Sequence, residues 1–112
     1  VLMQKSDMEK ATEKYITAIQ KTEVYHNYCN AKEVVQKDEN LWQQICDYRK
    51  KRYEFQTFTS PEEMFDRVEA FERDYREWKK DPRVSGFLDA ELAFCRMIQE
   101  SNIRIMEAIQ FE

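Results

Sequence analysis

The sequence predicts an all-α protein, an antiparallel bundle of about five helical segments that forms an oligomer. Its 112 residues include one Gly and two Pro, so residues that favour turns are scarce, and 36% of the residues are charged. Apolar residues recur at steps of three and four along most of the chain, which is the period of a helix and not of a strand. This length fits one domain, so we expect a single helical domain over residues 1–112, with residues 1–6 as a disordered start.

The first half of the chain predicts three helices. Ser6 and the glutamate three residues later have the spacing of a capping box. Thr22 is a candidate N-cap for the second helix, and the break before it leaves open two helices or one kinked helix. Asp38 is a candidate N-cap for the third helix, where Leu41, Ile45, Tyr48 and Phe55 share one face. The three helices are expected over about 7–21, 23–37 and 39–55.

The second half predicts two longer helices after a loop at 56–60. Ser60-Pro61 supplies a cap followed by a proline at the first helical position, and Asp81-Pro82 repeats this signal. The first of these helices follows an apolar seam at Met64, Val68, Phe71, Tyr75 and Trp78. The last helix is expected from Pro82 to about Gln110.

Two apolar strips run along this last helix. We expect the first to face inward; it comprises Val84, Leu88, Cys95, Ile98, Ile105 and Ile109. The second comprises Phe87, Ala90, Phe94 and Met97. A helix that is hydrophobic on two sides has to be covered on both. The second strip therefore predicts an oligomer interface, most simply of a homodimer.

One basic cluster stands out in an acidic chain. The net charge is −4 and the pI about 5.2, which disfavours non-specific binding to nucleic acid. Within the cluster, a candidate patch for an anion, an acidic partner or RNA comprises Tyr48, Arg49, Lys50, Arg52 and Tyr53. At about 100° per residue its charges spread around the helix, so an ordinary solvated face is the simpler interpretation.

The residue chemistry points away from catalysis and from bound cofactors. Glu23 and His26 have the spacing of one half of a di-iron site, but His26 is the single histidine in the chain. Cys29, Cys46 and Cys95 lack paired zinc spacing, and we expect them to be reduced thiols. We find no Gly-rich phosphate loop, so we expect no enzyme, no metal and no cofactor. No apolar run predicts a membrane span or a signal peptide, which favours the cytoplasm.

Two segments resemble the YlbF/YmcA family of small helical bacterial regulators. The shared pattern has a Glu-x-Tyr near the start of the second helix, an Ala and then an Asp around its end, and an Asp-Pro-x-Val-x-x-Tyr/Phe-Leu-x-Ala-Glu that opens the last helix. In this chain these elements are Glu23 and Tyr25, Ala31 and Asp38, and residues 81–91.

This resemblance implies an oligomerising cytosolic regulator without catalytic residues. Some relatives join a complex that assists the endoribonuclease RNase Y and affects competence, sporulation and biofilm formation. Some family complexes hold iron–sulfur clusters through cysteines of several subunits, but the three cysteines here lie on predicted helices, so we expect none. The favoured hypothesis is thus a regulatory adaptor that binds itself, related helical subunits and an RNase Y complex through helix faces. The alternative is direct RNA binding through residues 48–53.

Overall fold

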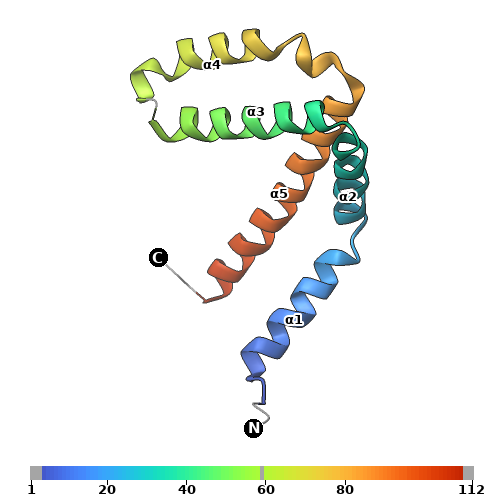
Figure 1. Ribbon diagram of the computed structural model, residues 1–112. Helices are drawn as coiled ribbons and strands as arrows, with labels where there is room; N and C mark the ends of the chain where they lie inside the picture. The colour runs from blue at the N-terminus through green and yellow to red at the C-terminus, as the bar shows by residue number, and fades with distance from the viewer. Residues whose placement is uncertain (1–3, 59, 110–112) are drawn as a thin grey trace. The chain divides into compact units, whose positions relative to one another are not determined.

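The computed structural model describes residues 4–58 and 60–109, and over these ranges it contains α-helices, one 3-10 turn and no strand. The prediction of an all-α protein is therefore confirmed. The chain divides into two compact units, a terminal unit of residues 1–30 and 90–112 and a central unit of residues 31–89. The elements, labelled in Figure 1, are α1 (Asp7–Gln20), α2 (Glu23–Gln36), α3 (Glu39–Phe58), α4 (Pro61–Tyr75), η1 (Trp78–Lys80) and α5 (Pro82–Ile109).

Local capping explains where most of the helices begin. The side chains of Ser6, Thr22 and Asp38 each accept a hydrogen bond from the backbone N–H three residues later, at 3.1 Å in every case. Each side chain satisfies a donor that the first turn of a helix leaves without a partner. The predicted starts of α1, α2 and α3 are thus confirmed, and a two-residue break at Lys21 and Thr22 makes α1 and α2 separate helices.

The predicted end of the third helix was wrong, and the predicted seam of the fourth helix extends beyond the helix itself. Helix α3 continues to Phe58 and not only to residue 55, because residues 56–58 include no Gly or Pro that would stop it. Three predictions involve residues outside the described ranges. These residues are Thr59 in the predicted loop, Gln110 at the expected end of α5, and residues 1–3 of the expected disordered start. Helix α4 ends at Tyr75, and Trp78 opens the 3-10 turn that follows. The Trp78 indole N–H donates to the Gln44 side chain at 2.9 Å, and this contact fixes Trp78 against α3.

In the central unit, α3 and α4 form an antiparallel hairpin (Figure 1). An aromatic cluster joins the two helices, since the ring of Tyr48 lies 5.4 Å from Phe71, 4.9 Å from Tyr75 and 5.1 Å from Trp78 between centroids. Such pairs add attraction beyond the burial of their apolar area. Among the residues whose burial the structure describes, the buried hydrophobic ones all belong to this unit and are Val35, Leu41, Ile45, Tyr48, Val84 and Phe87.

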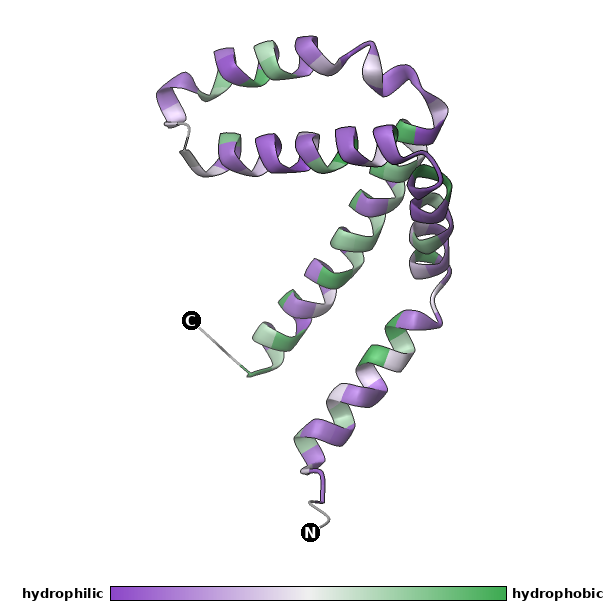
Figure 2. Cartoon of the chain, in the orientation of Figure 1, coloured by the Kyte–Doolittle hydropathy of each residue, from purple (hydrophilic) through white to green (hydrophobic). Residues whose placement is uncertain are grey.

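The terminal unit is held together by fewer contacts. The rings of Tyr25 and Tyr28, in the first half of α2, lie 5.6 Å and 5.1 Å from the ring of Phe94 on α5. No residue of α1 is buried. Figure 2 shows long hydrophobic stretches along α5, whereas α3 is mostly hydrophilic. Several of these hydrophobic residues of α5 are exposed, among them Ile103, Met106 and Ile109.

Candidate protein-binding surfaces

The two predicted capping aspartates meet at one arginine. Arg83, in the first turn of α5, lies 2.8 Å from the Asp81 carboxylate and 3.3 Å from the Asp38 carboxylate. The second oxygen of Asp81 accepts the backbone N–H of Arg83 at 2.9 Å and so caps α5. Arg83 thus ties the start of α5 to the start of α3 inside the central unit. Asp38 and Asp81, the two aspartates of the family pattern, thus connect the starts of two helices through Arg83.

This ion pair predicts a dependence of stability on pH. Hydrogen bonds from the Arg83 side chain and backbone hold the pKa of Asp81 below its ordinary value. Asp81 therefore stabilises the fold at a pH above about 4, and this contribution is lost as the pH falls through its lowered pKa. We expect Asp81→Asn, which keeps a capping oxygen, to lower the melting temperature at pH 7 and to flatten its decline in acid. Circular dichroism melts from pH 7 to 2 measure both effects, and an unchanged acid dependence would contradict the assignment.

The basic cluster of α3 does not form one patch. Tyr48 is 4% exposed, whereas Tyr53 is 67% exposed. The Arg52 guanidinium and the Lys79 ammonium lie 5.5 Å and 5.0 Å from the centre of the Tyr48 ring, and Arg49 lies against another ring, that of Phe87. The prediction that Tyr48 belongs to a binding patch is wrong, because its ring packs in the hydrophobic core.

The cations that remain exposed sit among carboxylates. Lys50 and Lys51 are exposed on α3. Lys51 lines a depression of about 650 Å³ between α3 and α4, together with the charged side chains of Glu54, Arg67 and Asp74. Two acids and two bases share this lining, so it offers no net positive charge to an anion.

Each strip of α5 follows its expected role only in part, since Val84 of the inward strip is buried and Leu88 and Ile98 are half-buried as predicted. Phe87 has no exposed surface, because it packs against Trp42 with ring centroids 5.8 Å apart. It therefore has no area to offer to a second chain, which corrects its place in the predicted interface. The other members of that strip, Ala90, Phe94 and Met97, are half-buried. By contrast, three members of the strip that was expected to face inward are exposed: Cys95, Ile105 and Ile109.

Exposed apolar side chains are concentrated in the terminal unit, which has seven of the ten large ones among the described residues. Five of these seven belong to the part of α5 that lies in the terminal unit, and they are Leu92, Ile103, Ile105, Met106 and Ile109. In the central unit, two aromatic rings are exposed among the side chains that the structure describes: Tyr53 on α3 and Phe65 on α4, the latter at 78%. Periodicity alone did not single out Phe65, because it lies beside the predicted seam of α4 and not on it.

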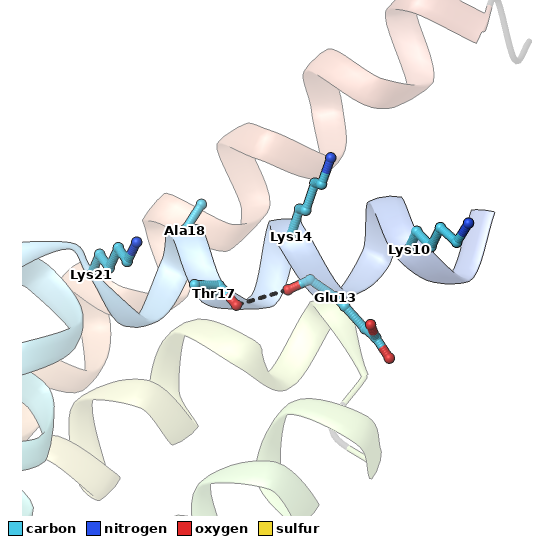
Figure 3. A pocket seen from close by; sticks show the side chains of 6 residues that line it. All are labelled: Lys10, Glu13, Lys14, Thr17, Ala18 and Lys21. Atoms are coloured by element: carbon cyan, nitrogen blue, oxygen red, sulfur yellow. Dashed lines mark hydrogen bonds between the residues drawn. The ribbon is translucent and has the colours of Figure 1, made fainter. Parts of the chain in front are cut away.

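Helix α1 presents a basic face. Figure 3 shows six side chains of α1 and its C-cap that border an open space of about 580 Å³, and three of them are lysines: Lys10, Lys14 and Lys21. The hydroxyl of Thr17 donates to the backbone carbonyl of Glu13 at 3.0 Å and is therefore already bonded. Since every lining residue comes from one helix and its C-cap, this space is an exposed face and not an enclosed site.

The cysteines and the histidine do not converge. Cys29 and Cys46 are half-buried and Cys95 is exposed, and all three are free thiols. A side-chain hydrogen bond with Cys29 raises the pKa of Tyr25. Among residues 4–58 and 60–109, no three His, Cys, Asp or Glu side chains are grouped so that they could hold a metal ion. No described helix is both long enough and apolar enough to cross a membrane.

These features define a class, that of small all-helical proteins with exposed apolar helix faces. The chain belongs to the YlbF/YmcA family, because the family model described as "Control of competence regulator ComK, YlbF/YmcA" matches residues 8–110. This confirms the resemblance seen in the sequence and supports a regulatory role. The chain is also similar to a UPF0342 protein of Caldicellulosiruptor bescii, with 26% identity over 98 residues that cover 86% of this chain and 82% of the relative. No solved structure matches it significantly.

Proposed function

We propose that this protein is a non-enzymatic regulatory adaptor that binds other protein chains through exposed helix faces in the bacterial cytoplasm. The observation that carries the proposal is the set of large apolar side chains left exposed on α3, α4 and α5. Contiguous apolar surface on a soluble chain commonly marks a site of protein association. Membership of a family described by control of a competence regulator supports a role in regulation.

The exposed aromatic residues of the central unit are the best anchors for a partner. Phe65 and Tyr53 are each more than two-thirds exposed, and aromatic side chains contribute a disproportionate share of binding energy at protein interfaces. The family resemblance favours a partner within an RNA-processing complex such as that of RNase Y, or a related helical subunit.

Direct RNA binding through residues 48–53 has less support. It required two aromatic rings on which bases could stack, and the ring of Tyr48 already packs against Phe71 at 5.4 Å and beneath Arg52 and Lys79. The net charge of −4 also opposes binding to phosphates. We therefore favour the adaptor.

Affinity capture from the native cell tests the proposal, with mass spectrometry of what is recovered. We expect protein partners that persist at high salt and after nuclease treatment, because an apolar contact releases few counterions. Replacing one aromatic anchor, in Phe65→Ala or Tyr53→Ala, should weaken the binding of a recovered partner by about 30-fold, the loss typical of a residue worth about 2 kcal/mol.

Glu69→Ala provides the control, because Glu69 is exposed on the same helix as Phe65 but contributes a charge and no apolar ring. It should leave partner binding unchanged. Recovery of RNA alone, lost at high salt, would instead support direct RNA binding. Equal weakening by Glu69→Ala and Phe65→Ala would refute the aromatic anchor.

A further inference from the structure

We propose that an exposed strip along residues 92–109 of α5 pairs with the same strip of a second copy of this chain, and that the two helices run antiparallel. This contact is separate from the anchors on α3 and α4, so it does not depend on the adaptor proposal. The strip, called here the α5 strip, comprises Leu92, Cys95, Gln99, Asn102, Met106 and Ile109, all of which are exposed.

The spacing of the α5 strip is that of a helix seam. Its members follow one another at steps of three, four, three, four and three residues, which keeps them on one face over about 27 Å of helix. None of them is charged, and Ile103 widens the strip with another exposed apolar side chain. An uncharged face of this length is unusual on the solvent side of a helix, where charges normally dominate. It has the chemistry of a surface that packs on another helix.

The strip is distinct from the face that the chain covers itself. Phe94 lies on another side of α5, where the rings of Tyr25 and Tyr28 cover it. In the same part of the helix, the half-buried residues are Ala90, Phe94, Met97, Ile98 and Ser101. Within the described terminal unit, the covered face and the α5 strip thus lie side by side around the helix, and only one of them has a partner.

Charge beside the strip selects a second copy and its direction. Arg96 and Glu107 lie on the same flank of the α5 strip, and no described residue forms an ion pair with either. In an antiparallel two-fold pair each flank meets its own copy, so Arg96 of one chain would face Glu107 of the other on both sides of the axis. In a parallel pair, the flank with Arg96 and Glu107 would instead face the other flank of the second chain. That other flank presents Ile98 and Ile105, so Arg96 would meet no exposed acid there.

The same pairing places a polar residue at the axis. The point midway between Arg96 and Glu107 falls between residues 101 and 102, so Asn102 of each chain would lie near the two-fold axis. An asparagine within an apolar seam fixes the register, because its amide is satisfied only opposite a matching polar group. The apolar members of the strip then lie on either side of the axis. The contact area is at the small end for protein interfaces, so we expect association at micromolar concentration.

Charge exchange tests this arrangement. Light scattering at tens of micromolar should give the mass of a dimer for the unmodified chain and a mass close to that of a monomer for Arg96→Glu. The double variant Arg96→Glu with Glu107→Arg should restore the dimer, because it recreates two opposite-charge pairs. Met106→Asp should also give monomers, whereas the control Met8→Asp, which changes a methionine that is 77% exposed on α1, should not. A monomer for the unmodified chain, or a double variant that stays monomeric, would overturn the proposal.

Cross-linking tests the direction of the helices independently. In an antiparallel pair centred near Asn102, the two copies of Cys95 lie about 20 Å apart, too far for a disulfide. Asn102→Cys, made with the three native cysteines replaced by alanine, should form a disulfide dimer rapidly on mild oxidation. A variant that retains Cys95 alone should not. A disulfide dimer through Cys95 at a comparable rate would show a parallel pair and overturn the antiparallel arrangement.

Discussion

Phe87→Ala is expected to destabilise the protein by about 3–5 kcal/mol, the range for truncating a buried phenylalanine. Phe87 is fully buried, and its ring meets Trp42 edge-on with an interplanar angle of 85°. Truncation removes this contact and leaves a cavity that the surrounding helices cannot fill without distortion. Because small domains have only about 5–15 kcal/mol of total stability, one such change brings this chain close to unfolding.

Phe65→Ala is the matched control, since it makes the same chemical change where the ring is 78% exposed. We expect its free energy of unfolding to stay within about 0.5 kcal/mol of the unmodified chain, as for most surface substitutions. Urea denaturation followed by circular dichroism measures both variants. Equal stabilities of the two variants would contradict the burial assigned to Phe87.

Tyr48→Ala is expected to have the second-largest effect, about 3 kcal/mol. The Tyr48 ring is the centre of the aromatic cluster that joins α3 to α4, with Phe71 stacked on it and Tyr75 and Trp78 within 5.1 Å. Removal of this ring takes away several aromatic contacts at once. The loss of stability should therefore exceed the loss expected from the buried apolar area of the ring alone.

Tyr53→Ala separates this packing role from any role in binding. Tyr53 lies in the same basic cluster but is 67% exposed, so its loss should leave the melting temperature nearly unchanged while it weakens partner binding. Parallel thermal melts of the two tyrosine variants give the comparison. A Tyr53 variant as unstable as the Tyr48 variant would show that the basic cluster is buried throughout.

Signals that act within a few residues could be predicted from the sequence. Ser6, Thr22 and Asp38 cap helices through bonds to backbone groups three residues away, so the sequence contains both partners of each bond. The same holds for the apolar stripe of α3, where Leu41, Ile45 and Tyr48 are all buried as expected. The stripe therefore already indicated that Tyr48 is a core residue. Tyr48 was nevertheless assigned to a surface patch, because basic residues surround it in the sequence.

Contacts between distant segments could not be predicted in this way. Both strips of α5 have helical periodicity, and nothing within α5 distinguishes those members of each strip that its own chain covers. The choice depends on Trp42 for Phe87 and on Tyr25 and Tyr28 for Phe94, residues of other helices. The end of α4 has a similar cause, since the bond from Trp78 to Gln44 reaches across to α3.

Helix α1 has a sound cap but no buried side chain, and this has a consequence for its dynamics. An isolated helix of 14 residues is marginal in water, so α1 depends on tertiary contacts for most of its stability. Its half-buried positions, Tyr15 and Ile19, provide few such contacts. Local opening of α1 should therefore need far less free energy than global unfolding, and its amide hydrogens should exchange with solvent well before those of α3. A partner that covered α1 would slow this exchange without any change in the fold.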